Sequence, residues 1–169
     1  MHLKNVADVY PLTSMQQLML IHALRDPDSP LLEEQLGCTL EGPLDVTAVE
    51  RAWQQAVDRH PALRTAVVWQ GLERPLQIVR EQVTLKLNQH DWSKLSAAEQ
   101  NARLAQWPEG ESRRPFVLSQ APLMRLDLIH LADDRHRFFC RAHHLLFDGW
   151  SLAVLLREVL ASYQAEHST

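Results

Sequence analysis

Two adjacent histidines, His143 and His144, stand shortly before an aspartate, Asp148, and a glycine, Gly149. Imidazole is the side chain best suited to moving protons near neutral pH. Neighbouring residues at a strand end point to opposite faces, so one histidine is expected to face a cleft while the other packs or orients the loop. The four residues therefore predict a loop site with one proton-transferring histidine.

The elements on either side of these residues would hold them in place. The apolar run Arg137–Cys140 predicts a strand before the histidines, and the apolar periodicity of Leu152–Tyr163 predicts a helix after them. Asp148, in the turn, could bind backbone amides or a distant arginine. Gly149 permits backbone angles that other residues resist, and Ser151 is expected to cap the helix. A loop fixed by two rigid elements is a common setting for functional side chains.

Other chemistries for this cluster are less well supported. A solvated or packed pair of histidines is the plain alternative. Adjacent histidines rarely chelate one ion, and no third ligand stands at a metal-site spacing, so no metal site is predicted. A serine–histidine–aspartate triad lacks the Gly-x-Ser-x-Gly turn that usually presents its nucleophile.

Three stretches together resemble one known family. His143–Gly149 resembles the HHxxxDG signature of condensation domains in nonribosomal peptide synthetases, whose core is shared with chloramphenicol acetyltransferase and other coenzyme-A-dependent acyltransferases. Tyr10–Gln17 is similar to the opening motif of the family, and Arg59–Thr65 is similar to its second motif. The three occur in the family's order, and the resemblance covers essentially the whole chain.

The resemblance implies a fold and an activity. The expected fold is α/β, a chloramphenicol-acetyltransferase-like lobe with a mixed sheet packed with helices. The expected activity is amide-bond formation between two carrier-bound thioesters, with His144 at the attacking amine as general base or orienting group. His143, the first histidine of the motif, and Gly149 are expected to be catalytic residues with His144. Gly149 would leave room beside the substrate, with its backbone amide near the reacting groups. Asp148 would hold the loop. Two alternatives remain open for Arg64: its guanidinium pairs with Asp148, or it is solvated.

The resemblance also implies partners and a missing half. Donor and acceptor peptidyl carrier proteins would bring 4′-phosphopantetheine arms, no cofactor would bind directly, and an adenylation domain would be adjacent in the full synthetase. Domains of the family are well over twice this length and contain two lobes. Residues 1–169 are therefore expected to be the N-terminal lobe with the C-terminal lobe absent, inactive alone and exposing an apolar face that invites self-association.

Two further function classes stay open. The lobe could be a non-catalytic module that docks carrier proteins or a complementary lobe. It could instead belong to a related acyltransferase that uses coenzyme A and a hydroxyl acceptor, although Tyr10–Gln17 and Arg59–Thr65 favour the synthetase branch. Heterocyclisation relatives carry aspartates in place of the histidines, and Gly149–Ser151 fits condensation better than epimerisation.

Composition narrows the class of protein. The chain has 169 residues, 46% of them hydrophobic and 22% charged, as expected for one globular unit with its own core. A formal net charge of −4 gives no support for nucleic-acid binding, and no apolar run approaches membrane-spanning length. Cys38 and Cys140 are interpreted as buried thiols in a reducing cytoplasm.

The remaining elements follow from periodicity and capping residues. Trp150 is interpreted as a packing anchor for the last helix. Helices are expected from Met15 to Arg25 after a cap at Thr13 or Ser14, from a cap at Asp45 through Val57, and from a cap at Ser96 to Trp107. Strands are expected at Leu36–Leu40, Leu63–Trp69, Pro75–Arg80, Val83–Leu87 and Leu123–Leu131, the second and third forming a hairpin.

Overall fold

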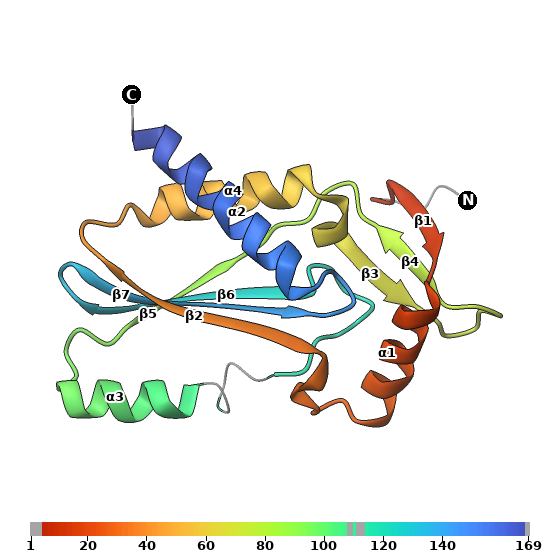
Figure 1. Cartoon of the computed structure of the whole chain (residues 1–169), viewed down its shortest axis with the longest axis horizontal. Coiled ribbons are helices and arrows are strands. Elements are labelled where there is room, and N and C mark those ends of the chain that lie inside the picture. Colours follow the sequence, from red (N-terminus) through yellow and green to blue (C-terminus); the bar gives the residue numbers. More distant parts are fainter. Residues whose placement is uncertain (1–4, 108–109, 111–113, 168–169) are drawn as a thin grey trace.

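A mixed four-stranded sheet forms the centre of the protein (Figure 1). The computed structural model describes residues 5–107, 110 and 114–167. The strand order is β2 (Glu33–Glu41), β7 (Arg135–His143), β6 (Met124–Ala132) and β5 (Leu87–Asp91). β5 runs parallel to β6, and the other neighbours are antiparallel. The expected mixed sheet is thus confirmed.

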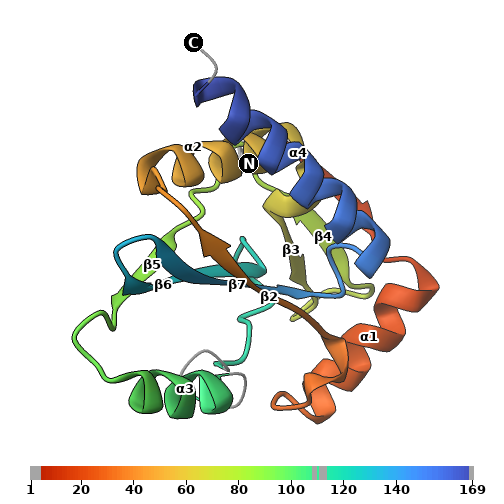
Figure 2. The same cartoon turned by 60° about the vertical axis from the view of Figure 1, so that its left-hand side comes forward.

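Helices cover both faces of this sheet. α2 (Val46–Arg59) and α4 (Gly149–His167) lie on one face, and α3 (Ala97–Gln106) lies on the other (Figure 2). Side chains alternate along β7 as a strand requires. Phe138 and Cys140 join the core beneath α2 and α4, whereas Phe139 stacks on Trp107 at 5.9 Å between the sheet and α3.

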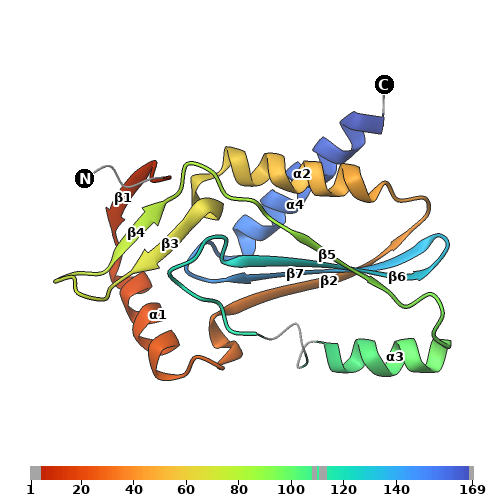
Figure 3. The ribbon, with the colours of Figure 1, turned by 180° about the vertical axis from the view of Figure 1, so that it is seen from behind.

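A smaller sheet and a helix close one end of the protein (Figure 3). Its order is β1 (Asp8–Pro11), β4 (Leu76–Val79) and β3 (Thr65–Val68), and α1 (Ser14–Arg25) follows β1. The expected hairpin is present as the antiparallel pair β3–β4. Short 3₁₀ turns, η1 (Pro30–Leu32) and η2 (Pro61–Arg64), precede β2 and β3. A second apolar cluster joins this end to the main sheet: Leu12, Leu20, Val67, Leu118, Leu123 and Leu145.

Three helix starts agree with the caps expected from the sequence. Thr13 forms a capping box with Gln16 at the start of α1, and Ser96 forms one with Glu99 at the start of α3. The carboxylate of Asp45 accepts a hydrogen bond from the backbone amide of Ala48 at 3.0 Å at the start of α2. Each side chain satisfies an amide that the first helical turn leaves without a partner.

The expected strand at Val83–Leu87 is wrong, because the strand β5 begins only at Leu87. The amide side chain of Gln54, on α2, donates to the carbonyl of Val83 at 2.8 Å and accepts from the backbone amide of Leu85 at 3.0 Å. Val83 and Leu85 are both buried. The Gln54 side chain therefore supplies backbone hydrogen bonds that a neighbouring strand would otherwise supply. Residues 83–87 can thus show the apolar alternation of a strand without being paired in a sheet over that length.

Ion pairs fix α4 across α2. Glu158 on α4 accepts from Arg59 at 2.9 Å and lies 2.7 Å from the His60 ring nitrogen, and Arg51 contacts Glu166 at 2.6 Å. These contacts bring the second motif of the sequence onto the last helix. They hold the middle and the C-terminal end of α4 against α2.

Candidate active site

The histidine loop, defined as His143–Gly149, connects β7 directly to α4. His143 is the last residue of β7 and Gly149 the first of α4. The loop turns tightly, because the amide of Leu146 donates to the carbonyl of His143 at 3.0 Å. Gln16 on α1 donates to the carbonyl of Leu145 at 3.2 Å. The opening motif therefore contacts the histidine loop, which sequence spacing alone did not show.

His143 is a buried, structural member of this loop. The residue is 5% exposed, and its ring lies edge-on to that of Phe116, with 6.2 Å between the ring centroids. Its Nδ1 accepts a hydrogen bond from the backbone amide of Leu145 at 3.1 Å. Burial, and then the charge of neighbouring His144, lower the pKa of His143 to about 4. The imidazole is therefore neutral at neutral pH, with Nδ1 acting as an acceptor.

A cavity lies on the His143 side of the histidine loop. It has a volume of about 220 Å³ and is bounded by α1, the start of β2 and Phe116. His143 lines this cavity and His144 does not. The side chains of the two histidines thus lie in different surroundings, as the alternation of a strand predicts.

His144 carries the more accessible imidazole. Its side chain is 25% exposed, and its Nε2 lies 3.5 Å from Oε1 of Glu34, at the start of β2. Its backbone amide donates to the carbonyl of Leu32 at 2.8 Å, which holds the main chain of the residue against η1. The ring is therefore held by its backbone while its edge stays open to a reacting partner.

Gly149 stands against the same glutamate. A Cβ added to Gly149 would lie 3.2 Å from Oε1 of Glu34, closer than most real contacts of this kind. Glu34, His144 and Gly149 therefore gather at one point. Sequence reasoning missed Glu34, because the only signal was a glutamate where the alternation of Leu36, Cys38 and Leu40 would place an apolar residue.

Asp148 holds the start of α4 and is exposed. Its Oδ1 accepts from the backbone amide of Ser151 at 2.9 Å and from the hydroxyl of Ser151 at 2.7 Å. These hydrogen bonds lower the pKa of the Asp148 carboxyl. Asp148, not Ser151, is therefore the cap of the helix, and the helix begins earlier than the sequence predicted.

The pairing of Arg64 with Asp148 needs correction. The guanidinium of Arg64 donates to three backbone carbonyls, those of Val57 at 3.1 Å, Glu81 at 3.0 Å and Arg80. These groups lie where α2 ends and β4 leaves the smaller sheet. Arg64 thus stabilises the chain around the second motif, and the carboxylate of Asp148 is engaged by Ser151 instead.

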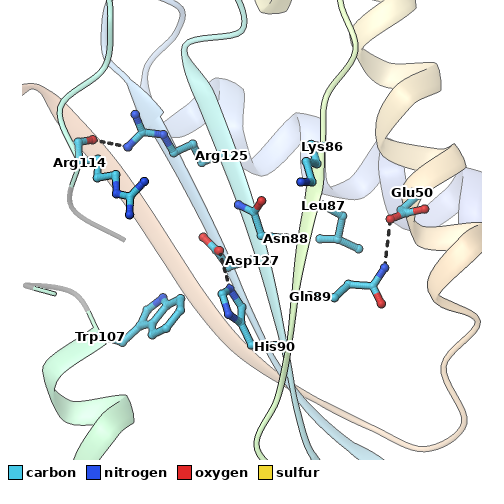
Figure 4. A pocket seen from close by; sticks show the side chains of 10 residues that line it. All are labelled: Glu50, Lys86, Leu87, Asn88, Gln89, His90, Trp107, Arg114, Arg125 and Asp127. Carbon is cyan, nitrogen blue, oxygen red and sulfur yellow. Dashed lines mark hydrogen bonds and ion pairs between the residues drawn. The ribbon is translucent and has the colours of Figure 1, made fainter. Parts of the chain in front are cut away.

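A second, polar hollow lies at the β5 edge of the sheet (Figure 4). There His90 Nε2 lies 3.0 Å from Asp127 Oδ1, and Arg125 donates to the carbonyls of Pro115, at 2.9 Å, and Arg114. No residue of the histidine loop lines it. Both His90 and Arg125 are engaged with neighbours, so the histidine loop remains the candidate active site.

Two other kinds of feature are absent from the part of the chain that the structure describes. No group of three or more histidine, cysteine, aspartate or glutamate side chains is arranged to hold a metal ion there. Among the described helices, none is long and apolar enough to cross a membrane.

An apolar groove runs beside the start of α4. Trp150 is 86% exposed and Val154 is 63% exposed, one turn apart on the helix. The expected packing role of Trp150 is therefore wrong. With the side chains of Leu63, Leu146 and Phe147 the two line a groove of about 530 Å³. A contiguous group of exposed apolar side chains, unlike a single one, marks a surface suited to a partner.

Comparison with known proteins identifies the family. The family model for the condensation domain matches residues 6–169. The chain is 43% identical over 162 residues to a linear gramicidin synthase of Brevibacillus parabrevis, covering 96% of this chain and 3% of that protein. It is 32% identical over 162 residues to tyrocidine synthase 3 of the same organism, covering 96% of this chain and 2% of that protein. The chain therefore spans only a small part of the length of either synthase.

Solved structures support the same assignment at the level of the fold. The starter condensation domain of rhizomide synthetase superposes with a TM-score of 0.83 at 23% identity, covering 96% of this chain and 40% of that one. The first condensation domain of the calcium-dependent antibiotic synthetase, in complex with a substrate analogue, gives 0.81 at 22% identity, covering 97% and 41%. The expected chloramphenicol-acetyltransferase-like fold is confirmed, and the chain belongs to the condensation domain family.

Proposed function

We propose that this chain is the N-terminal lobe of a condensation domain that forms amide bonds between carrier-bound thioesters in a nonribosomal peptide synthetase. The observation that carries the proposal is the position of His144, whose partly exposed side chain brings Nε2 to 3.5 Å from Glu34 directly after β7. A buried second histidine and a capped helix hold the loop that presents it. A proton acceptor on a rigid loop is what amine attack on a thioester needs.

The reaction follows from this arrangement. The amine of the acceptor aminoacyl group attacks the carbonyl carbon of the donor thioester. His144 takes the amine proton as the carbon–nitrogen bond forms, or holds the amine in line by a hydrogen bond. When the tetrahedral intermediate collapses, the carbon–sulfur bond breaks and the departing thiol regains a proton. The donor chain is then joined to the acceptor through an amide.

Each substrate would arrive on a carrier protein. The 4′-phosphopantetheine arms of a donor and an acceptor carrier deliver the two thioesters, and an adenylation domain of the same synthetase loads the acceptor. The arms are part of the substrates in this scheme, and no covalent intermediate on the lobe is needed. His143 supports the loop through the Leu145 amide, and Gly149 keeps space beside Glu34.

A C-terminal lobe would complete the site. The chain covers about 40% of the solved condensation domains that it resembles. The groove at Trp150 and Val154 lies on the helix that follows the histidine loop. A second lobe docked there would bury the apolar side chains and enclose the imidazole of His144. We therefore propose that the lobe alone has little catalytic power and can self-associate through this groove.

Detection of dipeptidyl carrier protein by intact mass tests the proposal. Two loaded carriers are mixed with the 169-residue chain alone, or with the chain and a matching C-terminal lobe. Product is expected only when both lobes are present, and His144→Ala should abolish it. Folded lobes that associate without forming product would contradict the proposal and favour a docking module without catalysis.

A further inference from the structure

Glu34 occupies a position where the pattern of its strand predicts an apolar residue. Along β2, Leu36, Cys38 and Leu40 point toward the core beneath α2 and α4. Glu34 continues this series toward the histidine loop and lies opposite Ala142 of β7, a core residue. A carboxylate at the rim of an apolar core carries a desolvation cost, so a partner is expected to offset it.

The partners of Glu34 on the lobe leave its carboxylate incompletely engaged. The neighbouring Glu33 pairs closely with the buried Arg141. Glu34 lies 3.5 Å from His144 Nε2, at the outer limit of a hydrogen bond, and its side chain is 31% exposed. Within the described residues no closer polar partner of its carboxylate is present. The pair therefore has the spacing and the exposure to admit a third group.

We propose that Glu34 binds the ammonium form of the acceptor amine and presents it to His144. This inference rests on the proposed function and names how its site recognises one substrate. A primary amine reaches the site largely as a cation at neutral pH, and a carboxylate is its natural partner. The cation binds at Glu34, and a proton passes from nitrogen to Nε2 of His144. His144 releases this proton to solvent, and the free lone pair then attacks the donor carbonyl. As the carbon–nitrogen bond forms, His144 takes the second nitrogen proton and passes it to the departing thiol.

This assignment gives the site a preference between acceptors. A carboxylate attracts a cationic amine and offers a neutral hydroxyl only an ordinary hydrogen bond. Once His144 has accepted the proton, its imidazolium lies beside Glu34 and is stabilised by that negative charge. Glu34 thus acts on the ammonium before the transfer and on the imidazolium after it.

Gly149 supports the same assignment from the other side. Because a side chain there would meet Oε1 of Glu34 at 3.2 Å, glycine leaves the carboxylate free to face His144. The amino-terminal end of α4 also lies near Glu34.

Calorimetric binding of two probes to the 169-residue chain tests the proposal without requiring turnover. Glycyl-aminopantetheine carries the amine on an amide in place of the thioester, and acetyl-aminopantetheine lacks the amine. The wild-type chain should bind the glycyl probe about fivefold more tightly. Glu34→Gln should remove this preference, Glu34→Asp should retain part of it, and Glu41→Gln, at the exposed far end of β2, should retain all of it.

The outcomes separate the two proposals. Equal binding of the two probes to the wild-type chain, including no binding of either, would overturn the role of Glu34. An undiminished preference in Glu34→Gln would also overturn it. A preference lost only in Glu34→Gln, together with no dipeptidyl product from associated lobes, would instead support the amine site and contradict the condensation activity.

Discussion

The carboxylate of Asp148 accepts two hydrogen bonds from one residue, Ser151, through its backbone amide at 2.9 Å and its hydroxyl at 2.7 Å. Because the helix starts at Gly149, this contact makes Asp148 the cap of α4. The aspartate of the histidine signature thus has a structural role, capping α4, and its partner Ser151 lies only three positions further along the chain.

Replacement of Asp148 should separate its capping from its charge. Asp148→Ala removes the acceptor and should lower the Tm by about 3 °C, whereas Asp148→Asn keeps an acceptor and should change the Tm little. Thermal unfolding followed by circular dichroism measures both. A loss in Asp148→Asn as large as in Asp148→Ala would show that the charge, and not the cap, matters.

Burial of His143 should make stability depend on pH. The pKa of His143 is about 4 in the folded protein, against an ordinary value of 6.5. The unfolded chain therefore binds a proton more readily, and stability is full above pH 6.5 and is lost as the pH falls toward 4. Urea unfolding at pH 7 and 5 should show the advantage of wild type over His143→Gln shrinking by about 2 kcal/mol. An advantage that stays the same at both pH values would contradict this prediction.

Arg64 and Asp148 should act independently. Arg64→Ala leaves three carbonyls near the end of α2 without their donor and should cost about 2 kcal/mol of unfolding free energy. Arg64→Lys keeps the charge but loses the fork, so it should recover only part of this cost. In a double-mutant cycle with Asp148→Asn the coupling energy should be close to zero. A coupling above about 1 kcal/mol would restore the direct pair that the structure does not show.

Local sequence rules predicted the parts of the fold that depend on nearby residues. The caps at Thr13, Asp45 and Ser96 follow from residues within one helical turn, and the hairpin β3–β4 follows from the turn signal at Gly71 between two apolar runs. The opposite surroundings of the two histidines follow from strand alternation. Each of these features is fixed by neighbours in the chain.

Features that depend on distant segments were missed. The start of β5 was displaced because Gln54, on a helix, binds the backbone of Val83 and Leu85. Glu34 reaches His144 only because β2 pairs with β7, a strand far away in the sequence. Arg64 looked suited to a carboxylate, but carbonyls at the end of α2 and beyond β4 engage it first. To predict such contacts, one must know which strands and helices lie side by side, and the sequence pattern alone does not show this.

The groove beside α4 should carry the contact with a C-terminal lobe. Trp150→Ser removes its most exposed aromatic side chain and should weaken association of the two lobes by roughly tenfold or more, the effect of a central interface residue. Leu72→Ser, in the β3–β4 turn, is the matched control and should leave association unchanged. Analytical ultracentrifugation of the mixed lobes measures both. Equal weakening by the two variants would place the interface elsewhere.

Gly149→Ala should raise stability while it lowers turnover. Gly149 begins α4 without a positive backbone angle, so alanine suits the helix there and should add up to about 1 kcal/mol of unfolding free energy. The new methyl group meets Oε1 of Glu34 at 3.2 Å and turns the carboxylate away from His144, so dipeptide formation by the two lobes should fall about tenfold. Adding Glu34→Asp shortens the side chain and relieves the contact, so the double variant should recover part of the loss. Urea unfolding and intact-mass turnover assays on the same samples measure the two effects. A fall in both quantities, without recovery in the double variant, would mean that Gly149 serves the backbone and not the space beside Glu34.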